Sequence, residues 1–433
     1  MRTVAFHTLG CKVNTYETEA MRKLFVSKGY EVVDFKQVAD VYVINTCTVT
    51  NTGDSKSRQM IRRAIRTNPN ACVCVTGCYS QVASEEIQSI DGVGVILGTQ
   101  YRNEIVDLAE TYLSHKTTIC KVDNIMKTKR FEDLEVKSFA ENTRAFLKIQ
   151  DGCNNFCTYC IIPFARGLVR SRPKESVLKE AQSLVDNGFV EIVLTGIHTA
   201  GYGQDLENYS FADLLKDLCH NINGLKRLRI SSIETSQISK EIISLIVNEK
   251  IIVDHLHIPI QSGCDTVLSR MNRKYTCDQY FEKVNEIKSV LPSLAFTTDV
   301  IVGFPQETEE EFMETYRFIE KVGFSQLHVF PYSPRKNTPA AKMKGQVQDS
   351  IKTERVHRLI NLSNELHEKY ANQFINKEVE VIFEEVNKDG LLVGHSSNYL
   401  KVCAKGELSL IGEITKVEIS SYENGICTGF VKK

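Results

Sequence analysis

The chain has 433 residues, 42% of them hydrophobic and 25% charged, with a formal net charge of −1. This composition is typical of a folded protein of about three domains, and it excludes fibrous and disordered classes as well as recognition of nucleic acid by bulk charge alone. Without a signal segment or an apolar run of membrane-spanning length, we expect a cytoplasmic protein with no membrane partner. The 14 cysteines then indicate metal or redox chemistry rather than disulfides.

The first part of the chain alternates apolar strands with helical patterns. Strands are predicted at 3–9, 41–45, 72–76 and 93–97, and helices near 15–28, 54–67, 81–90 and 101–113. This alternation predicts an α/β domain with a doubly wound parallel sheet. We assign residues 1–115 to this domain and the charge-rich residues 116–143 to a linker.

Three cysteines of this domain lie where predicted strands end. Cys11, Cys47 and Cys78 each lie two residues after the end of a predicted strand. Open α/β sheets bind ligands at the carboxyl ends of their strands, so three separate loops would bring three thiols to one place. Either these thiols bind a second metal cluster, or they are three separate buried thiols, because free cysteine is often buried.

The next feature is a Gly/Asn-rich loop with the spacing Cys-x3-Cys-x2-Cys, formed by Cys153, Cys157 and Cys160. We interpret these cysteines as both metal ligands and catalytic residues: three thiolates bind three irons of a four-iron cluster and leave the fourth open to the amino and carboxylate groups of S-adenosylmethionine. A zinc site favours paired Cys-x2-Cys or Cys/His motifs, and core cysteines do not gather in such a loop.

Residues 144–372 predict a partial (β/α)6 barrel. Strands are expected at 144–149, 190–195, 225–231, 254–260, 295–302 and 325–330, and helices at 174–187, 210–221, 236–249, 275–290 and 308–322. The active site of such a barrel belongs at the carboxyl ends of its strands. There we expect Glu234 and Gln261 to bind the methionine amine or the ribose hydroxyls of the cofactor, and we interpret His255 and His257 as structural. The full set of predicted cofactor-binding residues is Tyr159, Gly196, Ser232, Glu234, Gln261, Arg273 and Asp299.

Residues 373–433 have a different pattern, with about five short strands in which apolar residues alternate with polar ones. Asp389-Gly390 supplies a hairpin turn. The pattern predicts a small closed β-barrel of the oligonucleotide-binding kind. Its nine acidic and seven basic side chains give no basic surface, so nucleic-acid binding by this domain cannot be argued from charge.

Basic side chains cluster elsewhere, beside the predicted active edges, and three such clusters would form a track for a phosphate backbone. The clusters are Lys56, Arg58, Arg62, Arg63 and Arg66; Arg166, Arg170, Arg172 and Lys174; and Arg270, Arg273 and Lys274.

With these motifs in hand, the sequence resembles the radical-SAM methylthiotransferases over essentially its whole length. The matching segments are Leu9-Gly10-Cys11-Lys12-Val13-Asn14, Asn45-Thr46-Cys47, Thr76-Gly77-Cys78, Gly152–Gly167 and Asp299–Pro305. The first of these, with Gly167–Arg172 and Thr195–His198, is most similar to the MtaB type. Members of that type methylthiolate N6-threonylcarbamoyladenosine at position 37 of tRNA.

The resemblance implies two [4Fe-4S] clusters, one bound by Cys153, Cys157 and Cys160 and an auxiliary one bound by Cys11, Cys47 and Cys78. It also implies a C-terminal TRAM domain that helps to hold the substrate. The expected reaction uses two S-adenosylmethionine molecules: one is cleaved to a radical that removes the hydrogen from carbon 2 of adenine, and the other methylates the sulfur. The expected partners are the anticodon stem-loop of tRNA and a reduced flavodoxin or ferredoxin-type electron donor, and we expect a monomer.

Three other readings share part of this pattern. An isopentenyladenosine tRNA methylthiotransferase would differ from this pattern only in the residues of its motifs. A ribosomal-protein aspartate methylthiotransferase would share both clusters and the fold. A non-catalytic RNA-binding or iron-sensing protein would form no 5′-deoxyadenosine. The sequence does not identify the residues that contact the threonyl group, nor whether that group is open or cyclised.

Overall fold

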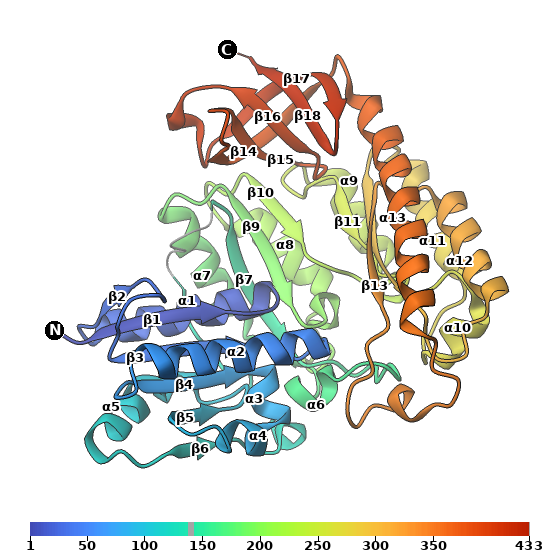
Figure 1. Cartoon of the computed structure of the whole chain (residues 1–433). Coiled ribbons are helices and arrows are strands. Elements are labelled where there is room, and N and C mark those ends of the chain that lie inside the picture. Colours follow the sequence, from blue (N-terminus) through green and yellow to red (C-terminus); the bar gives the residue numbers. More distant parts are fainter. Residues whose placement is uncertain (137–142, 433) are drawn as a thin grey trace.

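The structure, a computed structural model, describes residues 1–136 and 143–432, and it begins with a six-stranded parallel sheet (Figure 1). From one edge to the other, its strands are β2 (Glu31–Val33), β1 (Thr3–Thr8), β3 (Val41–Thr46), β4 (Cys72–Gly77), β5 (Val93–Leu97) and β6 (Ile119–Lys121). One face packs against α1 (Lys12–Ser27) and α5 (Ile105–His115), and the other against α2 (Asn51–Thr67), α3 (Cys78–Val82) and α4 (Ser84–Gln88). The predicted doubly wound sheet is confirmed.

Two details of this sheet differ from the prediction. The single helix expected near 81–90 is two short helices, α3 and α4, separated at Ala83. The short strands β2 and β6 were not predicted, and β6 extends the sheet beyond the predicted boundary at residue 115. Three-residue edge strands carry too little periodicity to stand out in a sequence. Part of the predicted linker, residues 137–142, lies outside the described residues.

The central part contains six parallel strands in two arcs. The first arc has the order β10 (Arg227–Ile230), β9 (Glu191–Gly196), β7 (Ala145–Asp151) and β8 (Arg170–Ser171), and the second has β11 (His255–His257), β12 (Ala295–Val302) and β13 (Gln326–Pro331). Only β8 is antiparallel within these arcs, and a parallel bridge between Leu228 and Ile252 joins them. The outer helices are α7 (Lys174–Asp186), α8 (Phe211–Asn221), α9 (Lys240–Asn248), α10 (Asp265–Arg270), α11 (Cys277–Val290) and α12 (Glu309–Val322). This arrangement is the predicted partial barrel.

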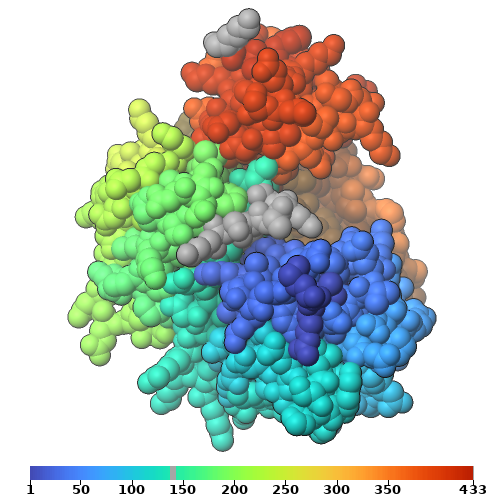
Figure 2. Space-filling model, turned by 90° about the vertical axis from the view of Figure 1, so that its left-hand side faces the viewer, coloured from blue at the N-terminus to red at the C-terminus, as the bar shows by residue number. Residues whose placement is uncertain are grey.

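A long helix, α13 (Asp349–Ala371), packs along β13 and leads to the C-terminal barrel (Figure 1). We did not predict it from the sequence. The barrel contains β14 (Glu378–Val386), β15 (Leu392–Ser396), β16 (Lys401–Lys405), β17 (Ile414–Glu423) and β18 (Ile426–Val431), closed in the order β14-β15-β16-β18-β17. Closure leaves no unpaired strand edge, as predicted. In Figure 2 this barrel and the N-terminal domain lie at opposite ends of the visible face.

A buried ion network joins the N-terminal domain to the central barrel. Glu17 of α1 contacts Arg102 at 3.1 Å, Lys148 at 2.7 Å and Arg166 at 2.5 Å, and Lys148 and Arg166 also contact Asp151. The Glu17 side chain is fully buried. Burial alone would raise the pKa of Glu17, but the three cations overcome this effect and lower it from 4.5 to about 2. Glu17 is therefore a carboxylate at neutral pH, shared between two domains.

Two further polar contacts tie the parts together. Arg335, after β13, donates to Thr48 Oγ1 at 2.6 Å, to Asn51 Oδ1 at 2.6 Å and to Asp54 at 2.5 Å, all on the segment after Cys47. At the other end of the molecule, Arg229 of β10 donates to the backbone oxygen of Ser397 in the C-terminal barrel. Among the described residues, no helix is long and apolar enough to cross a membrane.

The ion network predicts a large loss of stability in Glu17→Gln. The substitution leaves buried cations without their carboxylate, which costs about 3–5 kcal/mol of unfolding free energy. Because the folded-state pKa of Glu17 lies below its unfolded value, its contribution is present above the unfolded-state pKa and is lost as pH falls toward 2. Denaturant unfolding over a pH series should show the difference between wild type and variant shrinking in acid.

The matched control is Asp107→Asn, which removes an exposed ion pair with Lys28 in the same domain. Exposed pairs contribute at most about 1 kcal/mol, so this variant should unfold almost like the wild type. If Glu17→Gln lost no more stability than Asp107→Asn at neutral pH, the network would not be the junction described here.

Candidate functional site

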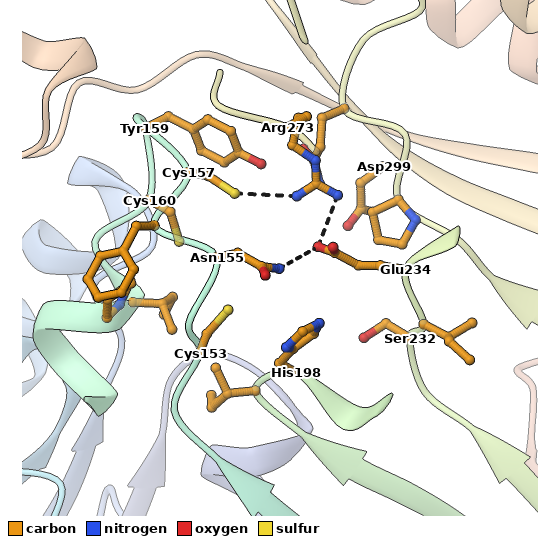
Figure 3. Close-up of a pocket in the computed structure, with 17 residues that line it drawn as sticks. Cys153, Asn155, Cys157, Tyr159, Cys160, His198, Ser232, Glu234, Arg273 and Asp299 are labelled. Atoms are coloured by element: carbon orange, nitrogen blue, oxygen red, sulfur yellow. Dashed lines mark hydrogen bonds and ion pairs between the residues drawn. The ribbon is translucent and has the colours of Figure 1, made fainter. Parts of the chain in front are cut away.

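The Cys153 loop connects β7 to α6 (Ile162–Arg166), and its backbone allows little freedom. Gly152 has φ +77°, and a Cβ added there would lie 1.9 Å from the carbonyl oxygen of Leu168, so only glycine fits. Backbone hydrogen bonds from Cys153 to Gly167 and from Thr158 to Met271 hold the two ends of the loop. The sulfur atoms of Cys153, Cys157 and Cys160 consequently gather at one side of a pocket (Figure 3).

Burial makes the thiolate form costly at Cys153 and Cys160. Burial raises the pKa of Cys153 to about 11 and that of Cys160 to about 12, and Cys157 adds to both shifts, so positive metal charge is needed to hold thiolates here. In the described part of the chain, no three His, Cys, Asp or Glu side chains are arranged to hold a single metal ion. A four-iron cluster binds each thiolate at a different iron, so its ligands stand further apart.

A pocket of about 300 Å³ opens in front of these sulfur atoms. Its polar walls come from the carboxyl ends of barrel strands, as a parallel barrel requires. Six of the seven predicted cofactor-binding residues line it: Tyr159, Ser232, Glu234, Gln261, Arg273 and Asp299. Gly196 instead lines a neighbouring cavity. The geometry thus brings most of the predicted set together, and their individual contacts with a cofactor stay predictions.

One hydrogen-bonded group connects the cysteine loop to the far wall of the pocket. Arg273 contacts Glu234 at 3.0 Å and Cys157 Sγ at 3.4 Å, and Asn155 Nδ2 donates to Glu234 at 2.9 Å (Figure 3). Burial opposes the charge of Arg273, but Tyr275, Tyr159, Glu234 and Cys157 together raise its pKa above the usual arginine value. A fixed carboxylate with a fixed cation beside the sulfur atoms can orient a ligand that carries both an ammonium and a carboxylate.

Two polar side chains of the pocket were not predicted as site residues, namely Asn155 and His198. Asn155 belongs to the cysteine loop, and His198 follows the end of β9, where the imidazole ring faces Cys153 and Glu234 (Figure 3). Burial lowers the pKa of His198, which favours the neutral ring. Their positions in a loop and at a strand end were the available signal.

The other three cysteines also gather, as the positions of their strands suggested. Gly10 has φ +112°, and a Cβ added to it would lie 3.0 Å from Cys47 Cβ and 3.2 Å from Cys47 Sγ, so the Cys11 loop closes directly on Cys47. Cys11 and Cys47 both act electrostatically on Cys78. Burial raises the pKa of Cys78 to about 12, while Arg166, whose Nε donates to Cys78 Sγ at 3.1 Å, opposes that shift.

Cysteines of both groups line cavities that have wall residues in common. Cys160 lines a cavity of about 270 Å³ together with Val49 and Thr50, which follow Cys47 in sequence. Cys11 lines another of about 580 Å³. Asp299, in the middle of β12, lines both of these cavities as well as the pocket at the Cys153 loop. Cys11 of one group and all three cysteines of the other therefore line neighbouring cavities that have Asp299 in common.

The predicted phosphate track is only partly exposed. Arg166, Arg170 and Arg172 are buried, with Arg172 held by Glu180 at 2.6 Å and by Asp133 at 2.7 Å, so the prediction that they contact a phosphate backbone was wrong. These arginines lie too deep in the protein to contact a phosphate backbone, because they pair with carboxylates at the domain junction. On α2, by contrast, Lys56, Arg62 and Arg66 are exposed to solvent.

Comparison with known proteins finds two family models in this chain. Residues 3–98 match an uncharacterized protein family, UPF0004, and residues 147–319 match the radical SAM superfamily. Threonylcarbamoyladenosine tRNA methylthiotransferase MtaB of Bacillus subtilis is 58% identical over 423 residues, covering 97% of this chain and 94% of the relative. A tRNA-2-methylthio-N(6)-dimethylallyladenosine synthase of Lachnoclostridium phytofermentans is 36% identical, covering 99% and 94%.

Solved structures share the fold at low identity. The radical S-adenosylmethionine methyltransferase TsrM of Kitasatospora setae aligns with a TM-score of 0.55 and 15% identity, over 78% of this chain and 77% of that one. The radical enzyme OxsB aligns with a TM-score of 0.52 and 13% identity, over 85% and 56%. These similarities support the architecture of the sheet domain and the partial barrel.

The pocket predicts that Glu234→Gln weakens binding of S-adenosylmethionine. The substitution keeps the size of the side chain but removes the charge that would pair with the ammonium of the ligand. A charged hydrogen bond is worth about 10- to 100-fold in affinity. The dissociation constant of the anaerobically reconstituted protein, measured by equilibrium dialysis, tests this.

Glu311→Gln is the control, because Glu311 pairs in the same way with Arg270 on the outside of the pocket. It should bind S-adenosylmethionine like the wild type. If Glu234→Gln bound S-adenosylmethionine with unchanged affinity, the Glu234 carboxylate would not contact this ligand.

Proposed function

The chain belongs to the radical-SAM methylthiotransferase family, and we propose that it methylthiolates carbon 2 of N6-threonylcarbamoyladenosine at position 37 of tRNA. The observation that carries this proposal is that Cys153, Cys157 and Cys160 line one cavity and Cys11 lines another, and that Ser232 and Asp299 line both. One group suits cleavage of S-adenosylmethionine and the other suits the handling of sulfur. The reaction needs both activities beside one substrate base.

The cofactors are two [4Fe-4S] clusters and S-adenosylmethionine. We propose that Cys153, Cys157 and Cys160 hold the first cluster and that Cys11, Cys47 and Cys78 hold the second. When bound, these groups supply the radical that removes the hydrogen at carbon 2 and the sulfur that replaces it. No side-chain base suffices, because that C–H bond is not acidic.

The chain's own residues would orient and enclose the reactants. The Glu234 carboxylate, fixed by Asn155 and Arg273, is placed to accept the ammonium of S-adenosylmethionine. Apolar side chains around the same pocket exclude water from the radical: Ile162, Pro163, Ile197, Ile233 and Pro259. Arg166 adds a buried positive charge next to Cys78, which favours a thiolate there.

The threonylcarbamoyl substrate is favoured over the isopentenyl one by the relatives. Those described as threonylcarbamoyladenosine enzymes include the 58% identical protein and one from Aquifex aeolicus at 40%, whereas the dimethylallyladenosine synthases reach 36%. Isopentenyladenosine remains the second candidate. A ribosomal-protein aspartate has less support as the substrate, because the names of these relatives describe tRNA-modifying enzymes.

We further propose how the enzyme is supplied and where it acts. tRNA is the macromolecular substrate, bound through the anticodon stem-loop, and the exposed basic side chains of α2 suit contact with its backbone. A reduced flavodoxin or ferredoxin-type protein would deliver the electron. The enzyme would work as a monomer in the cytoplasm, where tRNA and low-potential reductants occur together.

Replacing Cys11, Cys47 and Cys78 together by Ala should separate the two half-reactions. The variant should lose about four of about eight irons, form no methylthio product and still cleave S-adenosylmethionine to 5′-deoxyadenosine. Iron analysis and nucleoside chromatography measure these outcomes. Cys120→Ala, which removes an exposed cysteine of the same sheet, is the control and should keep all irons. Loss of all iron in the triple variant would contradict two separate clusters.

Expression of the protein in a strain lacking its own methylthiotransferases should add the mass of one methylthio group in place of hydrogen to N6-threonylcarbamoyladenosine. Mass spectrometry of nucleosides from total tRNA detects the product. A methylthio mark on isopentenyladenosine instead would transfer the assignment to the second candidate.

A further inference from the structure

The cavity of about 580 Å³ beside Cys11 is built by all three parts of the molecule. Cys11 and Lys12 come from the N-terminal domain, His255 and His328 from barrel strands, and Tyr399 from the C-terminal barrel. Ser232 and Asp299 belong to this cavity and also to the pocket at the Cys153 loop. A group attached to a base that lies between the two cysteine groups could therefore extend into this cavity.

Lys12 supplies an uncompensated positive charge in the wall. Among the described residues, no hydrogen bond or ion pair to its ammonium group is formed. The two nearby arginines are already paired: Arg229 contacts Glu191 at 2.6 Å, and Arg144 contacts Glu384 at 3.1 Å. Lys12 is half-buried, and an anionic occupant of the cavity would give its ammonium group a partner, so the wall favours a negatively charged group.

Imidazole rings line the same cavity. His255 Nε2 lies 3.0 Å from Thr297 Oγ1, while its buried Nδ1 has no hydrogen-bond partner in the part of the chain that the structure describes. His257 contacts Thr297 Oγ1 at 2.9 Å and Asp299 at 3.3 Å, and His328 lies beside it with ring centroids 5.6 Å apart. The occupant thus meets several groups able to bind hydroxyl and carbonyl oxygens. The sequence had suggested only a structural role for His255 and His257.

Tyr399 is held in the cavity wall by a strained backbone. It has φ +69°, in the left-handed region that aromatic residues seldom adopt. Its ring stacks on His255 at 4.8 Å and on His395 at 5.0 Å, and the Arg229 guanidinium lies over it at 4.9 Å. Strain of this kind persists where the surroundings over-determine it, often at ligand sites. The turn between β15 and β16 therefore closes the cavity with a rigid wall.

We propose that this cavity binds the carboxylate-bearing substituent on N6 of the substrate adenosine, with the Lys12 ammonium paired to the carboxylate. The inference rests on the proposed function and assigns its substrate specificity. A threonylcarbamoyl group carries a carboxylate, a hydroxyl and a urea carbonyl, all of which find partners here. A dimethylallyl group would leave the Lys12 ammonium and His255 Nδ1 without a partner from the ligand, and a polar site rejects such an apolar substituent strongly.

The test compares two synthetic anticodon stem-loops that differ only at the substituent. Both carry threonylcarbamoyl on N6 of adenosine 37, one with the free carboxylate and the other with a neutral carboxamide. Fluorescence anisotropy with the reconstituted protein gives the two dissociation constants. Wild type should prefer the carboxylate by about 10- to 100-fold, the value of a charge-assisted contact.

In Lys12→Met this preference should fall to near one, while Lys12→Arg should keep most of it. Lys28→Met, which removes an exposed lysine, should preserve the full preference. The ratio between the two RNAs also guards against an indirect effect through the adjacent Cys11, since damage there weakens both RNAs alike. Iron content of each variant is measured in parallel.

Two outcomes would overturn the proposal: no preference in wild type, or an unchanged preference in Lys12→Met at wild-type iron content. If Lys12→Met kept its iron and weakened both RNAs equally, Lys12 would contact a backbone phosphate instead. Failure of the proposed function looks different. In that case wild type would form no methylthio product on the carboxylate stem-loop, whatever its binding preference. Product formed equally well on both stem-loops would keep the function and reject the carboxylate site.

Discussion

The buried carboxylate of Glu17 is the contact on which the arrangement of the two cysteine groups depends. It neutralises Arg102 of its own domain together with Lys148 and Arg166 of the barrel. Arg166 in turn donates to Cys78 Sγ and ends the helix that follows the Cys153 loop. One ion network thus sets the position of the sheet domain relative to the Cys153 loop. Charges buried this deeply tolerate little displacement, because each cation would lose its partner.

Both cysteine groups follow a common rule of parallel sheets. In the N-terminal domain the thiols follow the carboxyl ends of β1, β3 and β4, and in the barrel they follow β7. Cys11 and the three cysteines after β7 line neighbouring cavities, and Asp299 belongs to the walls of both. Two chemistries that must act on one base are placed together by topology rather than by proximity in sequence.

The C-terminal barrel contributes more than its charge suggests. It has no excess of basic residues, yet its Tyr399 lines the cavity beside Cys11 and stacks on His255 of the central barrel. Arg229 and Arg144 connect the barrel strands to this domain by hydrogen bonds and ion pairs. Its part in the proposed recognition is to complete a wall, which a count of lysines and arginines could not reveal.

The amino-acid sequence was sufficient to predict the order of most helices and strands, the three-part architecture and the two groups of three cysteines. These predictions succeed because periodicity and cysteine spacing are local properties. It was also sufficient for most of the pocket, since strand ends in a parallel barrel converge by rule. The sequence wrongly predicted that Arg166 and Arg172 are exposed. Arg166 pairs with a carboxylate 149 residues away and Arg172 with one 8 residues away, and a sequence alone does not distinguish such a pairing from exposure to solvent. Lys12, His255 and Tyr399 belong to three different domains, and only the packing of those domains creates their common cavity. Long-range contacts of this kind leave no period or spacing in the chain, so tertiary structure alone decided them.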